Sequence, residues 1–204
     1  MFVVTVDQVD SRAHEDLVAP TVRDVSTKHA ASLLLPPERT AGDEFQVAAD
    51  DAEVVLDIVL ELTRTGSWSV GVGVGGVRHP LPASTREATG DAYYAARTAV
   101  DRAKKAPTRF ALETVTDEGD TADLARDCEA LIDLLLALRE RRTDGGWEIA
   151  DLLASGMSQK QAAEALGITA SAASLRIRAA GIRLEDRSIV ALRRLLERLG
   201  TLAG

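Results

Sequence analysis

The sequence is poor in the residues that cross-link small folds or hold soft metals. It contains one cysteine, Cys128, among 204 residues, which excludes an intrachain disulfide and a cysteine-based zinc cluster. Aromatic residues make up only 3% of the chain, so alanine, valine and leucine carry the packing. No apolar run is long enough to span a membrane, and Met1 leads directly into a strand pattern instead of a signal peptide. These absences predict a cytoplasmic globular protein with no membrane partner.

The charge is unevenly distributed along the chain. The net charge of −8 argues against a general nucleic-acid coat protein. Residues 1–120 hold about 12 basic and 20 acidic side chains, whereas residues 156–204 hold about 8 basic and 4 acidic ones. This asymmetry predicts two modules with different partners: a domain over 1–116, a linker and long connecting helix over 117–144, and a second domain over 145–204.

The first module alternates strand and helix patterns. Strands are predicted at 2–6, 33–35, 44–49, 68–74 and 109–115, and helices at 13–30, 51–65 and 91–105. Pro36 and Pro37 are expected to stop the second strand. The glycines of the fourth strand leave one face bare, which predicts close packing by another element. The order βαββαβ, followed by a helix and a strand, predicts a ferredoxin-like or palm α+β sandwich.

Residues 41–45, Ala-Gly-Asp-Glu-Phe, predict a hairpin tip that leads into a strand. The βαββαβ connectivity places this tip beside the end of the first strand. We therefore expect Asp7, with Asp10 as a further candidate, to lie near Asp43 or Glu44. Mg²⁺ takes carboxylate ligands together with substrate phosphates, and two such ions can clamp a phosphoryl transfer.

The loop after the first strand is a candidate phosphate site. Backbone N–H groups of residues 8–12, which include Ser11 and Arg12, precede a predicted helix and are placed to bind phosphates. The alternative, which spacing alone favours, is structural: aspartates at strand ends commonly cap turns.

Four motifs in the first module resemble those of nucleotide cyclases. Residues 41–45 resemble the Gly-Gly-Asp-Glu-Phe (GGDEF) hairpin of diguanylate cyclases and the Gly-Asp hairpin of class III nucleotidyl cyclases. The strand ending at Asp7 is similar to their first metal-binding strand. Residues 69–73 resemble their Ser-Ile-Gly-Ile strand, and residues 90–97 resemble their Ala-Asp-x-Ala-Leu-Tyr-x-Ala-Lys helix. Taken together, the motifs most resemble SatD-type bacterial proteins.

The resemblance implies a cyclase-type palm domain with a metal and nucleotide site. It implies that Asp7 and Asp43 bind Mg²⁺ or Mn²⁺, that Glu44 is a neighbouring acid, and that Arg97 takes the place of the phosphate-binding lysine. Ala41 replaces the first glycine of the hairpin, and no residue pair for reading a purine base is evident. We therefore expect a degenerate domain that keeps nucleotide binding without turnover.

The second module predicts a helix-turn-helix. A helix over 121–142 precedes a Gly-Gly break, and short helices are predicted over 147–154, 159–166 and 170–180. Residues 158–169 resemble the bacterial helix-turn-helix pattern, with a small Ala163 where the two helices meet. In DNA-binding versions the second helix enters the major groove.

The helix-turn-helix supplies candidate DNA contacts within residues 158–180. Serine, threonine, lysine and glutamine bind phosphates, and arginine binds phosphate or reads guanine. The candidates are Gln159, Lys160, Thr169, Ser171, Ser174, Arg176 and Arg178. The alternative is a protein-contact module in which the arginines are simply solvated.

The last predicted helix, residues 185–199, has a leucine stripe. This stripe predicts packing against helix 121–142 or homodimerisation through the two helices. The sequence as a whole predicts a DNA-binding transcriptional regulator with a degenerate, cyclase-like sensor or scaffold domain. The alternative is a metal-dependent nucleotidyl cyclase or related phosphotransferase with a helical dimerisation module.

Overall fold

The structure, a computed structural model, describes residues 1–204 and has an α+β architecture. A five-stranded mixed sheet is combined with eight α-helices. The chain forms two compact units, one of Met1–Asp133 together with Leu192–Gly204 and one of Leu134–Ala191. None of the helices combines the length and the apolar character that crossing a bilayer requires.

The sheet of the first unit follows the predicted order of elements. Its strand order is β2-β3-β1-β4-β5, with β1 antiparallel to both neighbours and β5 parallel to β4. The strands are β1 (Phe2–Gln8), β2 (Leu33–Ala41), β3 (Glu44–Ala49), β4 (Trp68–Val74) and β5 (Phe110–Thr114). The predicted succession βαββαβ, helix, strand is therefore confirmed.

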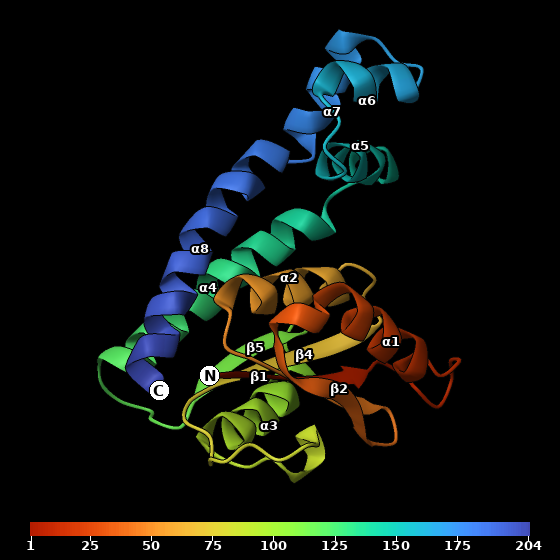
Figure 1. Ribbon diagram of the computed structural model, residues 1–204. Coiled ribbons are helices and arrows are strands. Elements are labelled where there is room, and N and C mark those ends of the chain that lie inside the picture. The colour runs from red at the N-terminus through yellow and green to blue at the C-terminus, as the bar shows by residue number, and fades with distance from the viewer. The chain divides into compact units, whose positions relative to one another are not determined.

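Helices cover both faces of this sheet. The three helices are α1 (Val18–His29), α2 (Ala52–Thr63) and α3 (Asp91–Ala103). Figure 1 shows α1 and α2 over one face and α3 over the other. The face under α1 and α2 is apolar and includes an edge-to-face pair of Phe45 and Trp68, whose ring centroids are 5.5 Å apart.

Two glycines of β4 let α3 lie very close to the other face. A Cβ at Gly71 would stand 2.1 Å from the backbone nitrogen of Val100, and one at Gly73 would stand 2.1 Å from that of Ala96. No side chain fits in this space. The predicted close packing against the glycine face is confirmed, and α3 is the element that packs there.

The second strand extends beyond its predicted end. It was expected to stop at Pro36, yet β2 continues through Pro36 and Pro37 to Ala41. β2 is an edge strand, where a missing N–H costs no ladder hydrogen bond. The pairing with β3 also shifts register between Leu35 and Glu38. The expected stop was therefore wrong because an edge position accommodates proline.

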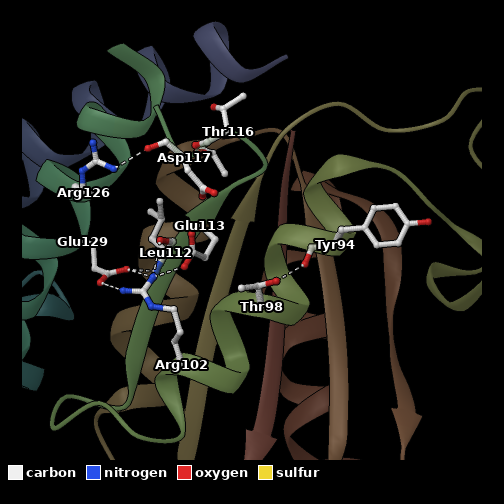
Figure 2. A network of polar contacts seen from close by, with 10 residues as sticks. Tyr94, Thr98, Arg102, Leu112, Glu113, Thr116, Asp117, Arg126 and Glu129 are labelled. Atoms are coloured by element: carbon white, nitrogen blue, oxygen red, sulfur yellow. Dashed lines mark hydrogen bonds and ion pairs between the residues drawn. The ribbon is translucent and has the colours of Figure 1, made fainter. Parts of the chain in front are cut away.

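The opposite edge of the sheet is closed by side chains, as Figure 2 shows. The backbone N–H of Leu112 on β5 donates to Glu129 Oε2 over 2.6 Å, and Arg102 Nη1 donates to the carbonyl of Leu112 over 3.4 Å. Arg102 also pairs with Glu113 at 2.5 Å and with Glu129 at 2.6 Å. Both outward-facing backbone groups of Leu112 are thus satisfied without a further strand.

The last helix, α8 (Ile182–Ala203), is longer than predicted and ends in the first unit. Arg193 pairs with Glu53 at 2.9 Å and with Asp57 at 3.2 Å on α2. Gly200 lies against the ring of Phe2, which is 3.0 Å from where a Cβ would stand. Three leucines of this segment are buried, Leu192, Leu196 and Leu199, whereas Leu202 near its end is 47% exposed.

The second unit contains the three short helices of the predicted helix-turn-helix region. α4 (Asp120–Glu140) leads into α5 (Asp144–Ala154), α6 (Gln159–Ala165) and α7 (Ala170–Ala179). The Gly145-Gly146 pair was expected to break the chain before a helix at Trp147. It lies instead in the first turn of α5, because Thr143 caps this helix and accepts a hydrogen bond from Gly146 N.

Candidate functional site

The hairpin tip lies beside the end of β1, as predicted. Gly42 has a φ of 53°, which suits a glycine at a tight turn. The backbone N–H of Gln8 donates to the carbonyl of Asp43 over 3.0 Å, and Asp7 is the register partner of Glu44. Asp7, Asp43 and Glu44 are therefore brought together at one edge of the sheet.

Asp43 is held by the loop that follows β1. Its carboxylate accepts a hydrogen bond from Ser11 Oγ. This bond holds the pKa of Asp43 below its ordinary value, and the positive charges of Lys104 and Arg12 lower the pKa further. The predicted residues Ser11, Arg12 and Asp43 thus form one local group.

Glu44 lies on the face covered by α3 and is buried, with 6% of its surface exposed. Its carboxylate pairs with Arg97 of α3 and accepts a hydrogen bond from Thr40 Oγ1 over 2.7 Å. Arg97, predicted to bind phosphate, therefore neutralises a carboxylate of the hairpin.

Asp7 is paired with a residue that the sequence did not single out. Lys104, the residue that caps the C-terminal end of α3, places its Nζ 2.8 Å from Asp7 Oδ2 and 3.8 Å from Asp101 Oδ1. The helix dipole favours a cation at this position. Lys104 follows Arg97 by seven residues, which puts both side chains on one face of α3, but this spacing does not identify Asp7 as the partner.

The loop after β1 uses part of its backbone N–H donors within the protein itself. Gln8 N donates to Asp43 and Val9 N donates to the carbonyl of Ser67 over 2.9 Å. These two of the five expected N–H donors are therefore already used. Asp10 has a φ of 50° and lines a pocket of 420 Å³ together with His14.

The implied metal ion does not fit the side chains as they are arranged. Asp7 is paired with Lys104, Glu44 with Arg97, and Asp43 with Ser11. No set of three or more histidine, cysteine or acidic side chains is placed to hold a metal ion. Mg²⁺ and Mn²⁺ bind through carboxylate oxygens, and at least one oxygen of each of these carboxylates is engaged by the protein's own donors.

The second candidate site is the pair of helices α6 and α7. Small residues let the helices approach, since Ala163 and Ala173 are buried where they meet. Ile149 of α5 and Ile177 of α7 complete the same core cluster. Gly167 has a φ of 63°, which forms the turn between the two helices.

The exposed face of α7 carries four residues at helical spacing. Ser171, Ser174, Leu175 and Arg178 are exposed, and Leu175 exposes 54% of its surface. No acidic residue occurs within α7. This face is open to a partner that carries negative charge.

Arg176, by contrast, turns toward α5. Its Nη1 lies 3.6 Å from Glu148 Oε2, and its guanidinium is 3.2 Å from where a Cβ on Gly145 would stand. Arg178 forms no such ion pair and is exposed. The two arginines predicted to bind DNA therefore occupy different surroundings.

The other predicted DNA contacts lie at helix starts. The hydroxyl of Thr169 accepts from Ala172 N over 3.1 Å and so caps α7. Gln159 Oε1 accepts from Arg183 Nη2 over 3.4 Å, and Lys160 lies 4.0 Å from Glu164. Lys160 stays exposed at the surface.

A buried ion cluster fixes the helices of this unit. Glu185 of α8 pairs with both Arg139 and Arg142, and Arg142 Nε donates to the carbonyl of Ala180 over 3.0 Å. The Arg142 guanidinium also stacks 4.4 Å from the ring centroid of Trp147. The partner of Arg142 lies 43 residues away in the chain, so no local sequence pattern predicts this cluster.

Comparison with protein-family models, with curated proteins and with solved structures gives no match.

Proposed function

We propose that the protein is a DNA-binding transcriptional regulator that contacts DNA through α7. The observation that carries this proposal is the exposed face of Ser171, Ser174, Leu175 and Arg178, presented by a helix that follows a tight Gly167 turn. Helix pairs of this kind place the second helix in the major groove.

The chemistry of this face suits a DNA groove. Arg178 has the geometry to bind a guanine edge or a phosphate, and the serine hydroxyls bind phosphate or base edges. Leu175 offers an apolar contact for a thymine methyl group. Lys160 on α6 adds a contact with the phosphate backbone of DNA, which makes part of the DNA affinity dependent on salt.

The N-terminal unit is proposed to be a degenerate, cyclase-type palm that serves as a sensor or scaffold. The antiparallel order β2-β3-β1-β4 and the hairpin beside β1 support the palm assignment. The pairing of Asp7 and Glu44 with basic side chains supports loss of turnover. A nucleotide ligand is proposed to bind near Ser11, Arg12 and Arg97.

A second copy of the chain is part of the same proposal. Besides Met157 and Leu175, the second unit exposes three large apolar residues on its long helices, Leu134 at 68%, Leu184 at 50% and Val190 at 53%. A homodimer that covers them matches the two half-sites of a typical operator. Sedimentation equilibrium of the full chain tests this point, since a monomer at all concentrations contradicts it.

The experiment for DNA binding starts from a pool of random duplexes, selected on the full-length protein. Fluorescence anisotropy then measures Kd for the enriched sequence with the wild type and with Arg178→Ala. We expect the substitution to weaken binding by about 1–3 kcal/mol, since it removes a base or phosphate contact.

Arg187→Ala is the matched control because Arg187 is an exposed arginine of α8 in the same unit. It removes the same charge and should change Kd much less. The proposal fails if selection enriches no sequence, or if the two variants weaken binding equally.

The juxtaposition of Asp7, Asp43 and Glu44 is the observation that favours the alternative, a metal-dependent nucleotidyl cyclase. Incubation with the four ribonucleotides and Mn²⁺, followed by mass spectrometry, tests it directly. We expect no product. A cyclic or dinucleotide product that disappears in Asp43→Ala contradicts the degenerate-palm proposal.

A further inference from the structure

Two carboxylates lie side by side at the end of β1, where repulsion has to be offset. Asp7 and Glu44 are directly opposed in the antiparallel pairing of β1 and β3, so their side chains leave the same face of the sheet. Like charges in this relation destabilise a sheet unless positive charge is placed beside them. The cyclase resemblance implies that a divalent metal ion supplies this charge.

In this chain α3 supplies the charge from its own side chains. Lys104 Nζ lies 2.8 Å from Asp7 Oδ2, and the Arg97 guanidinium pairs with Glu44. Glu44 exposes only 8% of its side chain and Asp7 only 17%, so both carboxylates are largely shielded from water, whereas Arg97 and Lys104 stay 56% and 34% exposed. Two monovalent cations from one helix face provide the same total charge as one divalent ion.

The close approach of α3 makes this replacement possible. Gly71 and Gly73 admit the helix backbone to a distance that no side chain on β4 would allow. Arg97 and Lys104 lie seven residues apart, which places them on the same face of α3. The glycine face of β4 thus lets α3 approach, and this approach brings Arg97 and Lys104 to the two carboxylates.

We propose that this site works without a divalent cation, because Lys104 occupies the position at Asp7 that a metal ion would take. The inference deepens the proposed function of the N-terminal unit and is independent of DNA binding. A sensor built in this way responds to its ligand at any concentration of Mg²⁺ or Mn²⁺.

The probe is Mn²⁺ alone, titrated into the full-length protein and followed by the electron paramagnetic resonance signal of free Mn²⁺. We expect no binding at this site in the wild type and no change of Tm with Mn²⁺ or with EDTA. Lys104→Met removes the cation from Asp7 and keeps the length of the side chain. This variant should bind Mn²⁺ at concentrations at least about tenfold below the highest at which the wild type shows no binding, since a unit charge next to the ion has been removed.

Lys105→Met is the matched control, because Lys105 is exposed at the neighbouring position. It should behave as the wild type. Adding Asp7→Asn to Lys104→Met should abolish the gained Mn²⁺ binding, which assigns it to this carboxylate. A folded Lys104→Met variant that gains no Mn²⁺ binding overturns the proposal.

The wild-type titration decides the matter even if Lys104→Met does not fold. Wild-type binding of Mn²⁺ that is lost in Asp7→Asn overturns the inference. If that binding comes with nucleotide turnover, the degenerate-palm proposal fails as well. If Mn²⁺ binds without nucleotide turnover, only the proposal of a metal-free site is rejected, and the degenerate-palm proposal stands.

Discussion

The carboxylate of Glu129 lies 2.6 Å from the guanidinium of Arg102 and also accepts the backbone N–H of Leu112 over 2.6 Å. A helix side chain thereby closes the free edge of β5, which would otherwise be a template for pairing with another chain. Arg102 and Glu129, which lie 27 positions apart in the chain, together protect this strand edge from pairing.

We expect Glu129→Ala to destabilise the protein by about 1–2 kcal/mol, because it leaves the Leu112 N–H without its partner. It should also promote self-association through the exposed strand edge. Urea unfolding and light scattering measure the two effects. Glu140→Ala, at an exposed position of the same helix, is the control and should leave both unchanged. Equal stability of the two variants contradicts the edge-closing role.

The adjacent tyrosines of α3 differ in their surroundings. Tyr93 is buried with a hydroxyl that has no hydrogen-bond partner, and burial raises its pKa to about 12. We expect Tyr93→Phe to stabilise the fold by about 1 kcal/mol, since it removes an unsatisfied polar group. Tyr94, which is 67% exposed, provides the control Tyr94→Phe with no expected change. Thermal unfolding compares the two, and a loss of stability in Tyr93→Phe shows that the hydroxyl has a partner in solution.

The glycine face of β4 allows a similar matched pair. Gly73→Ala should destabilise the fold by roughly 3 kcal/mol, because its Cβ has to displace the backbone of α3. Gly76→Ala adds the same atom where nothing lies within 4 Å, and it should be close to neutral. Denaturant midpoints measure both. If Gly73→Ala and Gly76→Ala unfold at similar denaturant concentrations, α3 does not lie in contact with Gly73.

Cys128 is fully buried, and burial, followed by the charge of Asp127, raises the pKa of its thiol to about 11. Because the thiolate is the reactive form, we expect iodoacetamide at about pH 8 to leave the folded protein unmodified. The unfolded protein in denaturant should react completely under the same conditions. Intact-mass spectrometry counts the adducts, and stoichiometric labelling of the folded chain contradicts the prediction.

The lowered pKa of Asp43 makes part of the stability dependent on pH. The folded-state pKa lies below the unfolded value of about 3.9, so the contribution is complete above about pH 4. It is lost as the pH falls through the folded-state pKa. Asp43→Asn should therefore be less stable than the wild type at about pH 7, by less than about 1 kcal/mol for a partly exposed group.

The difference should shrink as the pH falls below the unfolded-state pKa and vanish once it lies below the folded-state pKa, where the wild-type carboxyl is itself protonated. Urea unfolding over this pH range measures the free energy of unfolding of both proteins. Asp24→Asn, at an exposed position, is the control. A difference that persists at low pH shows that Asp43 acts through something other than its charge.

Local patterns predicted much of the fold. The alternation in β3 and β4, the Gly42 turn and the short helices after residues 158 and 169 are encoded by residues close together in the sequence. The structure has these elements where the sequence placed them. The meeting of Asp7 with Glu44 followed from connectivity.

What the sequence did not predict depends on distant partners. Lys104 reaches Asp7 only because two glycines admit α3, and Glu185 meets Arg142 across 43 positions of the chain. No local periodicity encodes either pairing. The length of β2 was missed for a different reason, since the rule that proline ends a strand depends on whether that strand lies at an edge.

The segment Leu192–Gly204 packs on Phe2 and on α2, which come from the first third of the chain. During synthesis the sheet unit therefore remains incomplete until the whole helix-turn-helix region has been translated. Its apolar surface at Phe2 stays exposed during that interval, and a chaperone is expected to bind there. Cells that stall translation after residue 133 should accumulate an aggregation-prone fragment, whereas loss of α5–α7 alone leaves both parts of the sheet unit present.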